Sequence, residues 1–396
     1  MNIAAVPSGD LAAIARNGVA ALGRGDAVAA RTAFDTVAAA GRATPQLWLL
    51  LAQANFQLDD RPLAHAALDQ LLAVDRANLD GMVMKGELFE RNGDERAAST
   101  WFEAALRTAP NAGQLAPVTL AALGRAEAAR DAAAGRFDAH LRRELAATGV
   151  DASAVHPRFA EALGIATGAA AIFPQAPTSF FYPRLAAIPF YDPADFPWLA
   201  DVTAAAPAMR AEVEGVIAAE NGIAPYVERP ENRPSKEHGL LGDARWSAYH
   251  FWREGVPVAA HHAACPVTIA ALANAPMPVI AGRSPMALFS ILAGATHIPA
   301  HNGMLNTRLI VHIPLIVPPG CRLRVGNEVC QVEAGVPLIF DDSIEHEAWN
   351  DSDEPRAILL FEVWRPELTL AERAALTAMF GAVSSYAAAA NTRRPA

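Results

Sequence analysis

The first 110 residues of the chain repeat with a period of 34 residues, and this repeat constrains the fold more than any other feature of the sequence. Four kinds of position recur: a small residue, an aspartate, an alanine and a large apolar residue. The matching positions are Gly18, Ala52 and Gly86; Asp26, Asp60 and Asp94; Ala30, Ala64 and Ala98; and Phe34, Leu68 and Phe102. Because so short a unit cannot bury an apolar face alone, the repeat predicts helical hairpins that stack on one another.

Small residues suit the close crossing of two helices, and the pairs Gly25-Asp26 and Gly93-Asp94 suit the turn between them. The pattern resembles the tetratricopeptide repeat, and the alternative is an unrelated alanine-rich helical bundle. Residues 117–148 are expected to form a capping helix, so residues 1–150 are predicted to be a helical repeat domain. Arrays of this kind either bind peptide segments in a groove or extend the surface of another domain, and both roles stay open.

Residues 151–396 differ in composition from the repeat region and are predicted to form a second domain. Prolines and aromatic residues appear at 180–199, and a helix is expected near 205–221. The polar segment 226–243 is either a binding loop or a plain surface insertion. Beyond residue 285, short runs rich in β-branched and aromatic residues alternate with turn residues, at 286–294, 305–318, 321–326, 328–335, 336–343 and 355–364. This pattern predicts an antiparallel sandwich or a jelly-roll barrel, and hence an α+β multidomain chain.

Charge and composition narrow the classes of partner. The formal net charge of −10 is spread along the chain, which argues against nucleic acid or an anionic membrane as the main partner. Cys265, Cys321 and Cys330 lack zinc-type spacing and are expected to be buried thiols. The N-terminus lacks a signal-peptide pattern and no run of about 18 uncharged apolar residues occurs, so we expect a cytoplasmic protein without a membrane anchor.

Two of the eleven histidines are the best candidates for metal ligands. His297 and His301 flank Pro299 in an extended pattern, where four residues span roughly 13 Å, so both cannot easily hold one ion. His301 precedes a tight-turn sequence, and His346 is expected at the end of the strand that begins near residue 336. The remaining histidines are expected to play structural or surface roles: His65, His140, His156, His238, His250, and the adjacent pair His261 and His262, which on a strand would face opposite ways.

Segments 289–326 and 339–368 closely resemble the aspartyl/asparaginyl β-hydroxylase family of Fe(II)- and 2-oxoglutarate-dependent dioxygenases. The similarity extends over about residues 155–380 and implies a double-stranded β-helix, that is, a jelly roll. Helices of the tetratricopeptide type ahead of such a domain are familiar in this family. The resemblance places the two iron-binding histidines on His301 and His346. Gly303 stands where most related oxygenases carry a ligating carboxylate, so water or co-substrate would complete the coordination, with Asp342 acting from a second shell.

The resemblance also assigns the co-substrate site. Arg356 matches the arginine that pairs with the distal carboxylate of 2-oxoglutarate, Ser290 matches the hydroxyl that assists it, and His312 matches a residue at the proximal carboxylate. Strand alternation puts Arg308, Ile310 and His312 on one face, where Arg308 would meet the acid group of a substrate. Members that hydroxylate Asp or Asn in epidermal-growth-factor-like domains carry an arginine where this chain has Ile310, which suggests a different substrate.

Three hypotheses for function follow. The first is a dioxygenase with Fe(II) and 2-oxoglutarate that hydroxylates the β-carbon of Asp or Asn in a peptide or protein, possibly one presented by the helical repeats. The second keeps this chemistry but acts on a lipid acyl chain or a small molecule. The third is a tetratricopeptide adaptor whose barrel is not catalytic; the intact His301, His346 and Arg356 speak against it.

Overall fold

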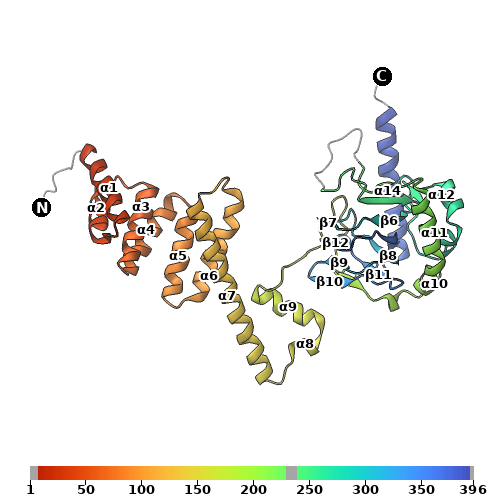
Figure 1. Cartoon of the computed structure of the whole chain (residues 1–396), viewed down its shortest axis with the longest axis horizontal. Helices are drawn as coiled ribbons and strands as arrows, with labels where there is room; N and C mark the ends of the chain where they lie inside the picture. Colours follow the sequence, from red (N-terminus) through yellow and green to blue (C-terminus); the bar gives the residue numbers. More distant parts are fainter. Residues whose placement is uncertain (1–7, 229–238, 393–396) are drawn as a thin grey trace. The chain divides into compact units, whose positions relative to one another are not determined.

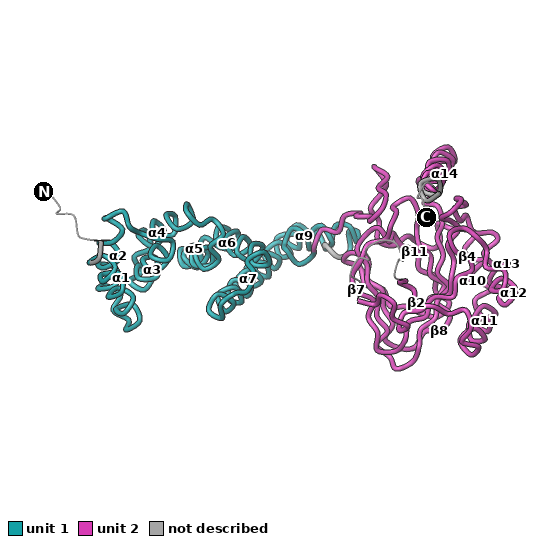
Figure 2. The backbone as a smooth tube through the Cα atoms, turned by 90° about the horizontal axis from the view of Figure 1, so that it is seen from above, with its two compact units in different colours: residues 1–170 teal, residues 171–396 magenta. Residues whose placement is uncertain are grey.

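The computed structural model describes residues 8–228 and 239–392, so His238 and most of the predicted loop 226–243 lie outside the described residues. The chain divides into two compact units, residues 1–170 and 171–396 (Figure 1, Figure 2). The division falls 20 residues later than the predicted boundary at 150. The reason is that helices α8 (Ala152–Val155) and α9 (Pro157–Thr167) pack against α7 (Pro117–Ala147), with the Thr167 hydroxyl donating to Asp138 Oδ1 at 3.3 Å.

The first unit consists of helical hairpins, as the repeat predicts (Figure 1). Their helices are α1 (Ser8–Gly23), α2 (Ala27–Ala39), α3 (Pro45–Gln57), α4 (Arg61–Val74), α5 (Leu79–Arg91) and α6 (Glu95–Thr108), followed by a 3₁₀ turn, η1 (Ala109–Asn111). Helix α7 packs against α5 and α6, which confirms the helix expected at 117–148. Each consecutive pair, α1 with α2, α3 with α4, and α5 with α6, forms one hairpin.

The repeated aspartates begin the second helix of each hairpin. The carboxylates of Asp26, Asp60 and Asp94 accept hydrogen bonds from backbone N–H groups three residues later, which satisfies donors left open at a helix start. The preceding position is left-handed in every unit, with φ +81° at Gly25, 55° at Asp59 and +79° at Gly93. Glycine suits this conformation because it has no Cβ.

The small and the large positions of the repeat contact one another. A Cβ at Gly18 would lie 2.7 Å from the ring of Phe34, and one at Gly86 would overlap the ring of Phe102. The middle unit has Ala52 and Leu68 at the same positions, both fully buried. A larger side chain on the first helix is therefore matched by a smaller one on the second.

The second unit contains two main antiparallel sheets, which confirms the predicted jelly roll. The seven-stranded sheet has the order β1 (Phe190–Tyr191), β11 (Leu338–Phe340), β8 (Arg308–Ile316), β13 (Arg356–Trp364), β6 (Ala287–Leu292), β3 (Trp246–His250), β2 (Ala224–Pro225). The four-stranded sheet has the order β10 (Glu328–Gln331), β9 (Cys321–Val325), β12 (His346–Asn350), β7 (Thr296–His301). A small hairpin pairs β4 (Trp252–Arg253) with β5 (Val256–Pro257).

Alternation along the long strands separates two cores. On β13, Leu359 and Phe361 join a core that includes α10 (Leu199–Ala204), α11 (Ala206–Ala219) and α13 (Pro266–Leu272), which cover one face of the large sheet. Ile358 and Leu360 face the other way, toward residues of the small sheet such as Leu323 and Ala348. The site described below therefore lies between the sheets. The remaining elements of this unit are η2 (Pro193–Asp195), α12 (Ala259–Ala264) and α14 (Leu370–Thr392).

One local expectation is wrong, and the strand geometry considered for His261 and His262 does not apply. His346 begins strand β12 instead of ending the strand before it, because β11 stops at Phe340 and a turn follows. His261 and His262 lie on helix α12 and not on a strand, and their ring nitrogens reach the carbonyls of His250 and Phe251 at 2.6 and 3.0 Å. The three cysteines are free, and Cys330 is only half-buried, unlike Cys265 and Cys321.

Candidate metal and co-substrate site

A cavity of about 540 Å³ lies between the two sheets of the second unit. Its wall contains every site residue expected from the sequence: Ser290, His301, Arg308, His312, Asp342, His346 and Arg356. Ile310 also lines it. Residues far apart in the sequence meet there because β6, β8 and β13 are neighbours in the large sheet, while β7 and β12 are neighbours in the small one.

The two candidate metal ligands face each other across adjacent strands. His301 pairs with His346 in the β7–β12 register, and their ring centroids are 4.2 Å apart. Nδ1 of His301 lies 2.8 Å from the carbonyl oxygen of Pro299, and Nδ1 of His346 lies 3.0 Å from that of Ile344. A carbonyl only accepts, so each Nδ1 carries a proton, and in the neutral form of the ring Nε2 then holds the lone pair that a metal needs.

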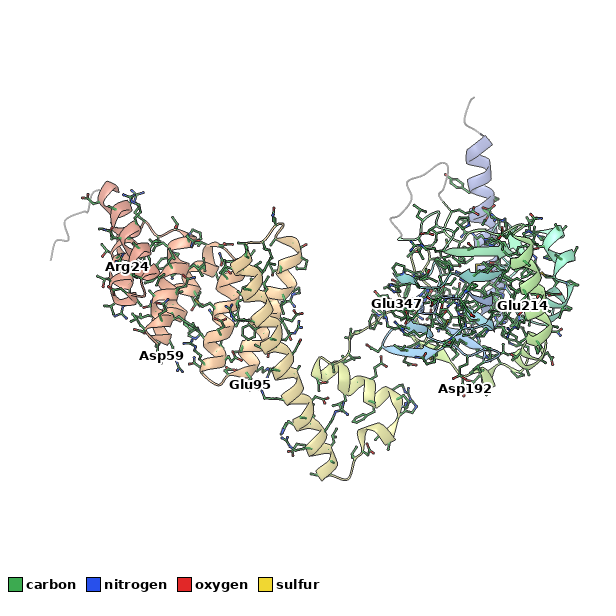
Figure 3. The ribbon with its side chains drawn as sticks, viewed as in Figure 1. Arg24, Asp59, Glu95, Asp192, Glu214 and Glu347 are labelled. Atoms are coloured by element: carbon green, nitrogen blue, oxygen red, sulfur yellow. The ribbon has the colours of Figure 1, made fainter. Side chains whose placement is uncertain are left out.

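Burial keeps His346 uncharged. It lowers the pKa of this imidazole to about 4, so the ring is neutral near pH 7, as ligation of a cation requires. His297, by contrast, faces away from the cavity: its ring stacks on Trp349, and its Nε2 lies 2.8 Å from Glu347, which Figure 3 labels. This arrangement agrees with the prediction that His297 and His301 do not share an ion.

Asp342 fills the space that a side chain at Gly303 would need. A Cβ built on Gly303 would overlap the Asp342 carboxylate, and the Gly303 N–H donates to the Asp342 carbonyl at 2.6 Å. Burial raises the pKa of Asp342 to about 6, and its Oδ1 has no hydrogen-bond partner among the described residues. No group of three or more His, Cys, Asp or Glu side chains in the described part of the chain could hold a metal, so the candidate centre has two imidazoles with this carboxylate nearby.

Arg356 is a buried cation that has no counter-ion among the described residues. It begins β13, is only 2% exposed, and its Nε has no hydrogen-bond partner among the described residues. Burial lowers its pKa to about 10, because the charged form loses hydration that nothing in the cavity wall replaces. An unpaired buried guanidinium is costly, so the arrangement fits an anionic ligand that is bound in a bidentate manner.

Ser290 and His312 lie on the strands at either side of Arg356. Ser290 is opposite Ile358 in the β6–β13 register, and its hydroxyl accepts a hydrogen bond from Trp246 Nε1 at 3.1 Å, which leaves its own proton for a ligand. Burial, with the nearby charge of Arg356, lowers the pKa of His312 well below its usual value. These groups fit one carboxylate end of a dicarboxylate such as 2-oxoglutarate.

Arg308 differs from Arg356 in having two carboxylate partners. Its Nη1 lies 2.5 Å from Glu362 and its Nη2 lies 3.3 Å from Asp342. Burial alone would lower the pKa of Arg308, but the two acids more than offset this and raise it. The guanidinium that was expected to meet a substrate acid is therefore already engaged by acids of the protein.

Sequence reasoning missed two residues of the cavity wall, Tyr226 and Trp246, and also Glu362, which pairs with Arg308 of that wall. Tyr226 and Trp246 stack with ring centroids 4.0 Å apart, and burial raises the pKa of Tyr226 to about 12. Glu362 had a usable signal: it is an even-numbered residue of β13, on the inward face with Arg356, and an acid at such a position needs a buried partner. Strand β3, which carries Trp246, was not predicted.

Comparison with known proteins assigns the second unit. Residues 203–366 match the family model described as aspartyl/asparaginyl beta-hydroxylase. This domain belongs to the aspartyl/asparaginyl β-hydroxylase family. In the hydroxylase domain, the matched range contains both histidines, Arg356 and Glu362. No helix in the described part of the chain is long and apolar enough to cross a membrane.

Two curated relatives of this hydroxylase domain differ in their named substrates. The ornithine lipid ester-linked acyl 2-hydroxylase of Rhizobium tropici is 37% identical over 188 residues, which are 47% of this chain and 63% of that protein. The human aspartyl/asparaginyl beta-hydroxylase is 36% identical over 151 residues, which are 38% of this chain and 19% of that protein. The chain thus spans less than two thirds of the length of either relative.

Among solved structures, PcrH in complex with the chaperone binding region of PopD covers 34% of this chain and 99% of its own, with a TM-score of 0.31 and 18% identity. A predicted oxalate decarboxylase from Thermotoga maritima covers 30% of this chain and 81% of its own, with a TM-score of 0.21 and 11% identity. At these scores the overlap adds nothing to the architecture described above.

Proposed function

We propose that the protein is an Fe(II)- and 2-oxoglutarate-dependent hydroxylase that acts on a carbon of an acyl chain. One observation carries the reaction class: the imidazoles of His301 and His346 face each other in the same cavity as the buried guanidinium of Arg356, which has no acid partner among the described residues. The pair suits a ferrous ion, and the guanidinium suits the far carboxylate of 2-oxoglutarate.

When bound, iron and 2-oxoglutarate supply the oxidising chemistry, in which dioxygen is consumed and succinate and carbon dioxide are formed. The residues of the chain would hold the metal and the co-substrate and orient the substrate. His301 and His346 would ligate through Nε2, because their Nδ1 atoms donate to backbone carbonyls. Arg356 and Ser290 would hold the co-substrate, and Asp342 Oδ1 would accept a hydrogen bond from a group bound in the cavity.

The proposed substrate class rests on the apolar wall and on the relatives. Ile310 lines the cavity at the position where family members that hydroxylate Asp or Asn in epidermal-growth-factor-like domains carry an arginine. The nearby Arg308 is already engaged by Glu362. The ornithine lipid hydroxylase also matches over a longer stretch than the human β-hydroxylase. The human match keeps an Asp or Asn side chain in a peptide as the second candidate.

The test uses the full chain with iron, ascorbate, dioxygen and 2-oxoglutarate. Succinate formation is measured with vesicles that contain ornithine lipid and, separately, with peptides that contain aspartate, and mass spectrometry follows the gain of one oxygen atom. We expect oxygen gain on the acyl chain. Oxygen gain on the peptide alone would replace the substrate class, and no succinate with either substrate would contradict the reaction class.

Substitutions test which residues are required for succinate formation and for binding of 2-oxoglutarate. His301→Ala and His346→Ala should abolish succinate formation, while His297→Ala should not, since that ring faces away from the cavity. Arg356→Lys should raise the Kd for 2-oxoglutarate about tenfold, because lysine keeps the charge but lacks the planar fork. Calorimetry on the zinc-loaded protein measures this Kd, and equal values for Arg356→Lys and wild type would rule out the assigned role of Arg356.

A further inference from the structure

We propose that Glu362 determines substrate specificity by engaging Arg308, so that the substrate end of the cavity takes an uncharged group and rejects a carboxylate. Arg308 then acts as a positioning residue that holds Asp342, and not as a reader of a substrate acid. This inference rests on the proposed function and narrows its substrate class to groups that carry no negative charge near Arg308.

The first step is that Glu362 is fixed in place. Its side chain is 1% exposed, and its Oε1 accepts the backbone N–H of Met286 at 3.0 Å while its own N–H donates to the Met286 carbonyl at 3.2 Å. Its second oxygen, Oε2, meets Arg308 Nη1 at 2.5 Å. A carboxylate anchored at both oxygens in a buried place cannot swing aside for a ligand.

The second step concerns the charges around Arg308. Two terminal nitrogens of one guanidinium each point at a different protein carboxylate, Glu362 and Asp342. A substrate carboxylate would have to displace one of them and would then lie beside two like charges in a buried site, where such repulsion is strong. Arg308 Nε has no partner among the described residues, but one N–H cannot grip a carboxylate in a bidentate manner.

The third step compares the surroundings of the two cavity arginines, Arg356 and Arg308, the second of which is marked on β13 by its partner Glu362. Arg356 and Glu362 stand six residues apart on the same face of β13, which corresponds to about 20 Å along an extended strand. Arg356, at the start of β13, has no acid partner in the described part of the chain and fits an anion. At the other end, Glu362 and Arg308 flank Ile310, since Glu362 is opposite Ile310 in the β8–β13 register. A dicarboxylate is thereby directed to one end of the cavity and an uncharged chain to the other.

The fourth step concerns Asp342. Arg308 holds Oδ2 at 3.3 Å and leaves Oδ1 without a partner among the described residues, beside Gly303 and within the cavity of the two histidines. The ion pair sets the direction in which Oδ1 points. Glu362 acts on the same residue indirectly, because it fixes the guanidinium that fixes Asp342.

Specificity is tested with octanoate and octanamide, which have the same chain and differ in charge. Binding to the full chain loaded with zinc and saturated with 2-oxoglutarate is measured by calorimetry. Wild type should bind octanamide at least as tightly as octanoate. Glu362→Gln, which frees Arg308 but keeps a hydrogen-bonding side chain, should shift the ratio at least fivefold toward octanoate.

Two further variants keep this test decisive. The double variant that combines Glu362→Gln with Arg308→Gln should not show the shift toward octanoate, because the guanidinium that Glu362→Gln frees is absent. Glu214→Gln, which removes an exposed acid paired with Arg210 on α11 (Figure 3), should leave the ratio at the wild-type value. Thermal unfolding of each variant checks that the fold is kept. A wild type that favours octanoate, an unchanged ratio in Glu362→Gln, or binding of neither amphiphile to any variant would each overturn the proposal.

The positioning role has its own readout, the visible spectrum of the cobalt-loaded protein. Arg308→Gln should change this spectrum, because Asp342 would turn, while Glu214→Gln should not. An unchanged spectrum would show that Arg308 does not set Asp342. The succinate assay separates the failure of the proposed function from the failure of this inference. A wild type that forms no succinate contradicts the proposed function, whereas turnover together with tighter binding of octanoate than of octanamide contradicts only this inference.

Discussion

At the scale of single residues, burial of uncharged imidazoles links stability to pH. Burial lowers the pKa of His250 to about 4 from 6.5, and the nearby Arg253 adds to the effect. Between these values the unfolded chain binds more protons than the folded one, so acidification favours unfolding. Through His250 alone, the free energy of unfolding should fall by up to about 3 kcal/mol as the pH is lowered from 6.5 to 4.

Urea unfolding of wild type and His250→Gln at about pH 7 and about pH 4.5 measures this effect. The variant should lose less stability on acidification than wild type does. His140→Gln, at an exposed position on α7, should behave as wild type. Parallel losses in wild type and His250→Gln would contradict the prediction.

Residue-level prediction from the sequence succeeds where a motif or a strand period fixes the position. His301 and His346 follow from motif resemblance, and alternation along residues 308–312 correctly places Arg308, Ile310 and His312 on one wall. The contact between Arg308 and Glu362 could not be predicted in this way. It joins neighbouring strands diagonally, and the register that creates it depends on the whole sheet.

At the scale of elements, the repeat hairpins are held by a match in side-chain size. Gly86→Ala should destabilise the first unit by about 1–3 kcal/mol, because the added Cβ overlaps the ring of Phe102. Adding Phe102→Leu should restore part of the loss, since the pair then equals Ala52 and Leu68 of the middle unit. Thermal or urea unfolding followed by circular dichroism measures both changes.

The control for this prediction is Gly135→Ala on α7, where an added Cβ meets nothing within 4 Å. It should raise stability by up to about 1 kcal/mol, since alanine favours a helix over glycine. A loss in Gly135→Ala equal to that in Gly86→Ala would point to a general effect of the substitution and not to the ring of Phe102.

The sequence predicts long strands and repeated helices better than short elements. Strands β6, β8, β9, β10, β11 and β13 lie within predicted runs, because each carries at least one β-branched residue and is bounded by turn residues. Strands β1 and β2 have two residues each and exist only because a neighbouring strand offers its edge. Because residues 345–353 are rich in acids, β12 was not predicted; its outward Glu347 pairs with Arg324 of β9.

At the scale of the whole molecule, the two units have separate cores. The clusters around Phe34 and Phe102 belong to the first unit, and those around Phe289, Leu323 and Phe380 belong to the second, with no buried residue in common. We therefore expect two unfolding transitions. Zinc and 2-oxoglutarate at about 100 times Kd should raise the second unit's unfolding free energy by about 2.7 kcal/mol and leave the first unchanged.

Tryptophan fluorescence and circular dichroism during urea unfolding distinguish the transitions, because the helical signal is concentrated in the first unit. In His346→Ala the ligand-dependent shift should disappear. A single unfolding transition, with the same urea midpoint by both probes and the same shift of that midpoint on adding ligand, would contradict the independence of the units.

The hydrogen bonds at the two histidine Nδ1 atoms have a consequence for how the centre forms. Each ring is tied to the carbonyl two residues earlier in its own segment, Pro299 for His301 and Ile344 for His346. Contacts of such short sequence separation close no long loop and cost little chain entropy. The imidazoles thus take their orientation as the segments form, so an incoming ion meets ligands that are already aligned and exchange of one metal for another requires no repacking of the barrel.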